Sequence, residues 1–158
     1  MQQPTLAEIE GVFFDAMLAG WASGAPAKNI PELPGSRIIS FCSGDFEVKD
    51  IFFVTPHSSK SGGTTTISFQ GDPVWLMQYG GWYLEHAVSF LKSCLNHAYK
   101  ERHFYGGRGL SRVRGTNMTY LNNIACNYFE AFGGNEWIID SNGGYLGTHW
   151  YRGMLLLS

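Results

Sequence analysis

The sequence predicts an α+β domain built mainly from antiparallel β-hairpins, with two helices. Aromatic residues make up 15% of the 158 residues, and 20 residues are glycine. Aromatic side chains favour strands, and glycine adopts the positive φ angles that tight hairpin turns need. From Arg37 onward apolar and polar residues alternate with a period of two, whereas helical spacing is confined to two segments.

The two helical segments are predicted at the start and in the middle of the chain. Thr5 and Glu8 form a capping box, which predicts a helix from Thr5 to Trp21. Apolar residues between Leu84 and Lys100 recur every three or four positions, the stripe of an amphipathic helix. We expect this second helix to cover one face of the sheet.

A length of 158 residues fits one domain. We expect an N-terminal helical part in residues 1–24, a proline-rich connection in residues 25–36 and a β-rich body with one inserted helix in residues 37–158. The Ser/Gly-rich residues 56–63 predict a mobile loop. Strands are expected at Arg37 to Cys42, Phe46 to Thr55, Thr64 to Gln70 and Val74 to Tyr79, with three or four more after the second helix.

Composition and charge exclude several classes of function. A net charge of −2 gives no general attraction to nucleic acid or to anionic membranes. Cys42, Cys94 and Cys126 are widely separated and include no C-x-x-C pair, so we expect free thiols in a reducing compartment. The sequence has no recognisable signal peptide and no apolar run of membrane-spanning length. We therefore expect a cytoplasmic protein with no metal and no cofactor.

The C-terminal hairpin has a mixed polar face. A turn at Asn142-Gly143 predicts pairing of residue 140 with 145, 138 with 147 and 136 with 149. Two carboxylates, an imidazole and a phenol then share one face, where acid–base chemistry or ligand binding is feasible. A solvated face held by cross-strand pairs is the alternative. The polar face holds Glu136, Asp140, Tyr145 and His149 with Ile138, and we interpret the face with Trp137, Ile139, Leu146 and Trp150 as core.

An earlier hairpin shows the same division. With a turn at Gly71-Asp72, one face combines large aromatic residues with small hydroxyl residues, which suits a shallow amphipathic pocket or the underside of a packed helix. Both interpretations remain open. The mixed face holds Trp75, Met77 and Tyr79 opposite Ser68, Thr66 and Thr64, and the other face holds Ile67, Phe69, Val74 and Leu76.

Five of the eleven basic residues lie within fifteen positions. Such a cluster can bind an anion, or it can be a solvated edge with gatekeeping charges. No helix-turn-helix, zinc-finger or RNA-binding motif accompanies it, so nucleic acid is disfavoured. The cluster consists of Lys100, Arg102, Arg108, Arg112 and Arg114.

Three segments carry a family resemblance: Gly44-Asp45-Phe46, the ten residues 71–80 that read GDPVWLMQYG, and residues 132–136 that read FGGNE. In this order and spacing the chain resembles an uncharacterised bacterial domain of unknown function, found alone or C-terminal to XRE-type helix-turn-helix regulators. The resemblance runs from Arg37 to the C-terminus and implies a ligand-sensing role by analogy. The chain departs from the family at residues 61–64 and at Arg152-Gly153-Met154, where the family has histidine-glycine-glycine.

Three hypotheses for function follow. The first is a small-molecule-binding or sensory domain, for a small-molecule or anionic ligand, with Asp50, Arg108 or Glu136 fixing a polar group. The second is a small hydrolase or isomerase that uses Glu136 and Asp50 as acid and base, helped by His149. The third is a structural homodimer joined through an aromatic sheet face. The predicted pocket of the first hypothesis is lined by Trp75, Tyr79, Tyr145, His149 and Arg108.

Overall fold

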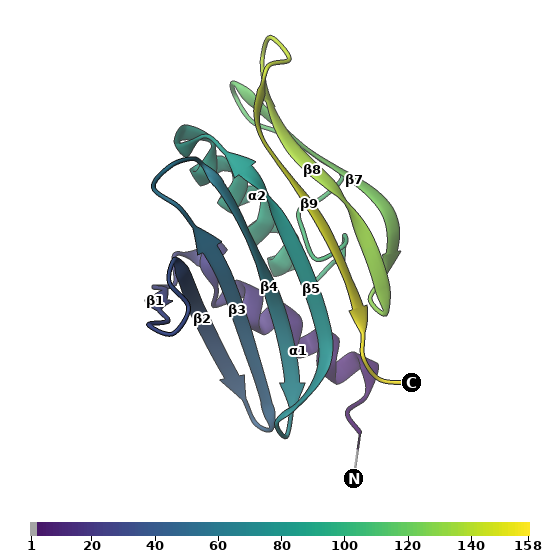
Figure 1. Cartoon of the computed structure of the whole chain (residues 1–158). Helices are drawn as coiled ribbons and strands as arrows, with labels where there is room; N and C mark the ends of the chain where they lie inside the picture. The colour runs from purple at the N-terminus through teal and green to yellow at the C-terminus, as the bar shows by residue number, and fades with distance from the viewer. Residues whose placement is uncertain (1–2) are drawn as a thin grey trace.

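The computed structural model describes residues 3–158. They form one open, fully antiparallel sheet of nine strands in the order β1-β2-β3-β4-β5-β9-β8-β7-β6, which confirms the predicted α+β class (Figure 1). The sheet is two runs of neighbouring hairpins joined where β5 pairs with β9. The strands are β1 (Lys28–Asn29), β2 (Ser36–Ser43), β3 (Phe46–Val54), β4 (Lys60–Phe69), β5 (Asp72–Tyr83), β6 (Arg112–Arg114), β7 (Met118–Tyr128), β8 (Ala131–Asp140) and β9 (Tyr145–Leu155).

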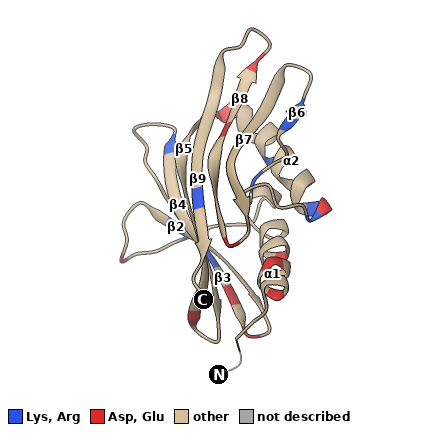
Figure 2. Cartoon of the chain, turned by 90° about the vertical axis from the view of Figure 1, so that its right-hand side faces the viewer, with Lys and Arg blue, Asp and Glu red and all other residues tan. Residues whose placement is uncertain are grey.

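The two helices, α1 (Leu6–Leu18) and α2 (Glu85–Glu101), cover the same face of the sheet. A 3₁₀ turn, η1 (Trp21–Ser23), follows α1. Figure 2 shows this layering from the side. The capping box is confirmed, since the Thr5 backbone N–H donates to Glu8 and the Glu8 N–H donates back to Thr5 Oγ1. The first helix ends earlier than predicted because the chain leaves helical geometry at Gly20, so Trp21 belongs to η1.

Aromatic rings fill the core between α1 and the sheet. Phe13 of α1 packs edge-on against several rings, among them Phe104 and Phe129. Trp75 of β5 makes stacked contacts with Phe129 and Phe132, and its indole Nε1 donates a 3.0 Å hydrogen bond to the Phe129 carbonyl. Because the indole is fully buried and satisfied, Trp75 is a packing residue.

The C-terminal hairpin pairs as predicted near its middle, where Glu136 lies opposite His149 and Ile138 opposite Gly147. The predicted assignment of its two faces is wrong, although Leu146 is buried as expected. Glu136, Ile138 and His149 face the helices and are buried, whereas Trp150 on the other side is 51% exposed. Period-two alternation shows which residues share a face, but the position of the helices decides which face is buried.

The tip of this hairpin also differs from the prediction. Asp140 Oδ1 accepts hydrogen bonds from the backbone of Asn142 and Gly144, which makes a longer turn. The register shifts after Ile138, so Tyr145 pairs with Ile139 and not with Asp140. Tyr145 is 63% exposed as a result.

The earlier hairpin turns one residue sooner than predicted. Gln70 and Gly71 both have positive φ, 51° and 93°, so they occupy the turn in place of Gly71-Asp72. A bulge after Ile67 then sets Trp75 opposite Ile67. Met77 consequently lies opposite Thr65, and the predicted pairing with Ser68, Thr66 and Thr64 is wrong.

The strands are also longer than expected: β4 begins at Lys60, which shortens the predicted loop, and β5 continues to Tyr83.

Three tyrosines on the helix-covered face each cross a neighbouring strand at a glycine. A Cβ on each glycine would meet the tyrosine ring or hydroxyl. The ring therefore lies over the glycine, and the hydroxyl donates to a polar side chain on the strand beyond. The three crossings are Tyr79 over Gly63 to Asp50, Tyr83 over Gly147 to Glu136, and Tyr151 over Gly134 to Asn122.

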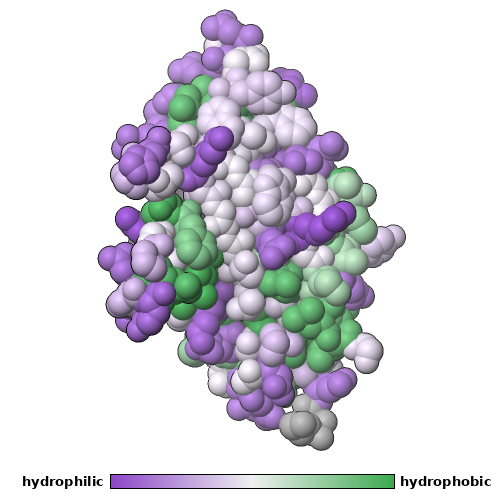
Figure 3. Space-filling view, viewed as in Figure 1, coloured by the Kyte–Doolittle hydropathy of each residue, from purple (hydrophilic) through white to green (hydrophobic). Residues whose placement is uncertain are grey.

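The opposite face of the sheet is covered by neither α1 nor α2. Figure 3 views this face and shows apolar and polar side chains interspersed. Phe53 of β3 is 48% exposed there, and Trp150 of β9 lies against Gly80. A homodimer joined through this face stays a prediction.

Candidate functional site

A cavity of about 220 Å³ lies between the two helices and the first run of hairpins. Strands β2, β3, β4 and β5 form one side, and α1, η1 and α2 form the other. Its walls are mostly apolar, and polar side chains gather where β3, β5 and β9 contribute residues. The apolar walls include Met17, Trp21, Ile39, Phe41, Val48, Phe52, Val88, Leu91 and Leu95.

Asp50 of β3 lines the cavity. Its Oδ1 accepts hydrogen bonds from the Tyr79 hydroxyl at 2.6 Å and from Thr65 Oγ1 at 3.2 Å. Burial raises the pKa of the Asp50 carboxyl, and these hydrogen bonds and the charge of Arg108 only partly oppose that rise. Both described hydrogen bonds end on Oδ1, which leaves Oδ2 to the cavity.

Arg108 lines the cavity from the loop between α2 and β6 and forms a buried ion pair with Glu136 of β8. Tyr83 and Tyr120 also donate to the Glu136 carboxylate, at 2.9 and 2.5 Å. Burial by itself would raise the pKa of Glu136. The positive charge of Arg108 and the hydrogen bonds from Arg108 and Tyr120 outweigh this effect, so the pKa of Glu136 is lowered. Two charges are thus buried as a neutral, hydrogen-bonded unit, the form in which burial of charge is tolerated.

Side chains from β7 hold the loop that carries Arg108. Asn122 Nδ2 donates to the carbonyl oxygens of Tyr105 and Gly109, at 3.1 and 2.8 Å. Asn127 Oδ1 accepts from the Gly106 N–H at 2.8 Å. Because the loop backbone is satisfied by these side chains, it can be buried and can present Arg108 toward the cavity.

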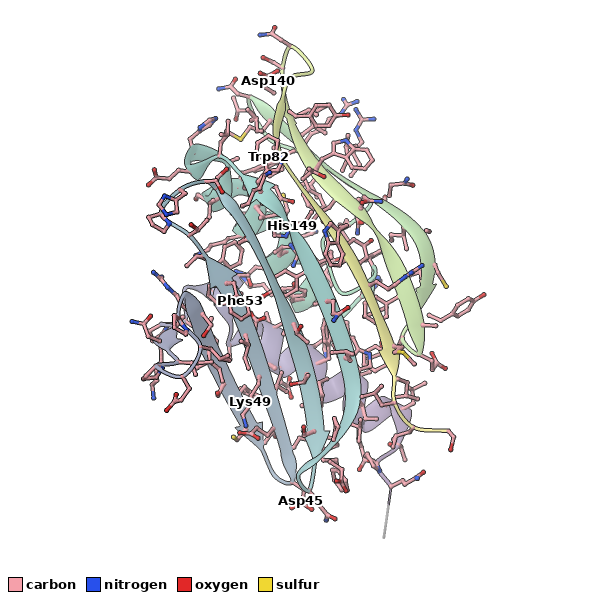
Figure 4. The ribbon with its side chains drawn as sticks, in the orientation of Figure 1. Asp45, Lys49, Phe53, Trp82, Asp140 and His149 are labelled. Carbon is pink, nitrogen blue, oxygen red and sulfur yellow. The ribbon has the colours of Figure 1, made fainter. Side chains whose placement is uncertain are left out.

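His149 of β9 is buried beside the cavity, close to Tyr79 and Tyr83, with ring centroids 6.1 and 4.9 Å away (Figure 4). Among residues 3–158, no hydrogen-bond partner is found for either ring nitrogen or for Arg108 Nε. Burial, with the nearby Arg108 charge, lowers the pKa of His149 to about 4. The imidazole is therefore neutral at pH 7, with one nitrogen that donates and one that accepts.

The structure brings together four of the predicted site residues and separates three. Asp50, Tyr79, Arg108 and His149 all line the cavity. Glu136 is fully buried and, through Arg108 and the tyrosines, supports the polar end without lining it. Trp75 lies in the aromatic core, and Tyr145 is exposed near the hairpin tip.

The predicted basic cluster is not one surface. Arg108 is buried, whereas Arg102 is exposed and pairs with Asp15 of α1 at 2.8 Å. Arg112 and Arg114 lie on the edge strand β6 (Figure 2). Their exposure fits the gatekeeping role of charges at a sheet edge.

Two tyrosines that line the cavity, Tyr83 and Tyr99, were not predicted as site residues. Tyr83 is four residues beyond Tyr79 and therefore on the same face of β5, so extending the strand through Gly80-Gly81 would have found it. Tyr99 lies on the buried face of α2 and donates to the Gly107 carbonyl at 3.2 Å. The helical stripe shows that Tyr99 is buried, but its contact with the loop depends on the tertiary fold.

Comparisons with family models, curated proteins and solved structures return no match to this chain. Within residues 3–158, no group of three or more His, Cys, Asp or Glu side chains is placed to hold a metal ion. No helix in that range is long and apolar enough to cross a membrane.

Proposed function

We propose that this domain binds a small, largely apolar molecule with one polar group in the cavity between the helices and the sheet. The observation that carries the proposal is that two residues lining that cavity have buried polar atoms without a partner in residues 3–158: Arg108 Nε, His149 Nδ1 and His149 Nε2. A buried polar atom without a partner costs about 1–3 kcal/mol. A ligand that supplies hydrogen bonds to these atoms would recover part of this cost.

The size of the cavity limits the ligand. An apolar cavity of about 150 Å³ is enough to hold benzene. A cavity of about 220 Å³ therefore suits one ring with a short substituent. The many aromatic and aliphatic walls favour a ring over a flexible polar molecule such as a sugar.

The resemblance to domains that follow DNA-binding modules supports a sensory role for such binding. An enzymatic role is the second candidate, because Asp50 and His149 both reach the cavity and Asp50 has a raised pKa. Glu136 is a poor choice as its acid or base, since its two oxygens already accept from Arg108, Tyr83 and Tyr120.

A thermal-shift screen with one-ring compounds tests the proposal. Ligands that bind only the native state raise its melting temperature. Val88→Phe adds a ring at the cavity wall and should abolish the shift, whereas Ser89→Phe adds the same ring at the next, solvent-exposed residue of α2 and should preserve it. Equal shifts in both variants, or no shift with any compound, would refute binding in this cavity.

A further inference from the structure

We propose that the polar group of the ligand is uncharged and carries a hydrogen-bond acceptor next to a donor, as an amide does. This inference rests on the proposed function and specifies the ligand class for the same cavity. The relevant groups are the unpaired nitrogens of Arg108 and His149 and the free oxygen of Asp50.

The charges around the cavity argue against a charged ligand. The positive charge of Arg108 is already balanced by Glu136. A carboxylate ligand would place a second negative charge beside Asp50, and charge–charge repulsion is strong in a buried site. An ammonium ligand carries donors but no acceptor, so it would leave Arg108 Nε and the donor nitrogen of His149 unpaired. An uncharged ligand with an acceptor avoids both costs.

The hydrogen-bonding groups argue for a ligand with both a donor and an acceptor. Arg108 Nε only donates, and neutral His149 donates through one nitrogen and accepts through the other. These groups need an acceptor on the ligand. Asp50 Oδ2 and the second His149 nitrogen accept, so they need a donor.

The tyrosines of the cavity leave this requirement unchanged. The hydroxyl hydrogens of Tyr79, Tyr83 and Tyr99 are directed to Asp50, Glu136 and the Gly107 carbonyl. None of the three hydroxyls is free to donate to a ligand. Among the buried donors next to Asp50 and Glu136, Arg108 and His149 are therefore the ones without a partner in residues 3–158. An amide carbonyl oxygen matches them while its N–H matches Asp50.

Three isosteric probes test the inference directly on the full chain: benzamide, benzoate and benzamidinium. They share one ring and a planar substituent, and they differ in charge and in hydrogen-bonding pattern. We expect benzamide to bind at least about tenfold more tightly than either ion at pH 7.5, measured by titration calorimetry or ligand-observed NMR. Tighter or equal binding of benzoate or benzamidinium would overturn the inference and leave the proposed function intact.

An Asp50→Asn variant adds a second readout. The amide removes the negative charge and offers an N–H₂ donor, so the ratio of benzoate to benzamide affinity should rise by about fivefold or more. Asp72→Asn, at an exposed residue outside the cavity, should leave the ratio unchanged. An unchanged ratio in Asp50→Asn would contradict the assigned role of Asp50.

Toluene distinguishes the two levels of the proposal. Binding of toluene without binding of benzamide would overturn the inference about the polar group alone. No binding of toluene or of any of the three probes would overturn the proposed cavity function as well.

Discussion

The Tyr79 hydroxyl donates a 2.6 Å hydrogen bond to Asp50 from two strands away, across β4 at Gly63. This contact fixes a carboxylate at the polar end of the cavity and leaves one of its oxygens without a described hydrogen bond. The same crossing geometry fixes Glu136 and Asn122, so the glycines opposite tyrosines organise the polar interior of the domain.

Replacing Asp50 with Asn should stabilise the protein at pH 8. Asn keeps the acceptor oxygen for Tyr79 and Thr65 but removes a buried negative charge. The raised pKa of Asp50 reflects the free-energy cost of burying that charge. The gain should vanish at low pH, where the Asp50 carboxyl is protonated. Asp50→Ala instead leaves both hydroxyls without their acceptor and should cost about 1–3 kcal/mol. Urea unfolding at the two pH values measures both effects, and a destabilised Asp50→Asn protein at pH 8 would contradict the assignment.

Removing one member of the Arg108–Glu136 pair should be far more damaging than removing both charges. Glu136→Gln or Arg108→Met leaves a buried charge without its partner, which typically costs about 3–5 kcal/mol. The double variant has no unpaired charge, and the single amide oxygen of its Gln can still accept from one of the two tyrosines, Tyr83 or Tyr120. Chemical denaturation of the four proteins gives the coupling energy, and additive losses would argue against a coupled pair.

The buried His149 should make the protein less stable as pH falls. Its pKa in the folded state is about 4, below the ordinary value of 6.5. Between these two pH values the unfolded chain binds a proton at His149 and the folded protein does not. Stability is lost as pH falls from 6.5 to about 4, by about 3 kcal/mol in total. Glu136, with a lowered pKa, adds to the loss only below its ordinary value of 4.5, and Asp50, with a raised pKa, acts in the opposite direction.

The His149→Phe variant isolates this contribution. Phe fits between the rings of Tyr79 and Tyr83 and cannot bind a proton. Its unfolding free energy should fall less than that of the wild type between pH 6.5 and pH 4.5, whereas exposed His86→Gln should behave like the wild type. Parallel pH profiles for His149→Phe and the wild type would rule out this role for His149.

Two adjacent glycines of β8 should respond differently to alanine. A Cβ at Gly134 would collide with the Tyr151 ring and hydroxyl and with the Asn123 carbonyl oxygen, and overpacking of this kind costs about 1–3 kcal/mol. A Cβ at Gly133 would come no closer than 3.3 Å to the Tyr151 carbonyl oxygen, so Gly133→Ala should change stability much less. Melting temperatures of the two variants make the comparison, and similar losses would show that Tyr151 does not depend on Gly134.

The sequence by itself determined the fold class, the presence of the two helices and which residues within a single strand share a face. These features follow from local patterns: the Thr5–Glu8 capping box, the apolar stripe of α2, and the alternation that groups Glu136 with Ile138. They do not require knowledge of what each face contacts.

The tertiary structure decided which face is the interior and which polar residues meet there. Apolar Trp150 is exposed while Glu136 is buried, because both helices pack on the side where Arg108 and two tyrosines satisfy the carboxylate. Asp50, Arg108 and His149 come from strands and a loop far apart in the chain, and only the nine-strand order brings them to one cavity. Burial of polar groups depends on partners distant in sequence, and for that reason a local pattern predicts the strands but not the site.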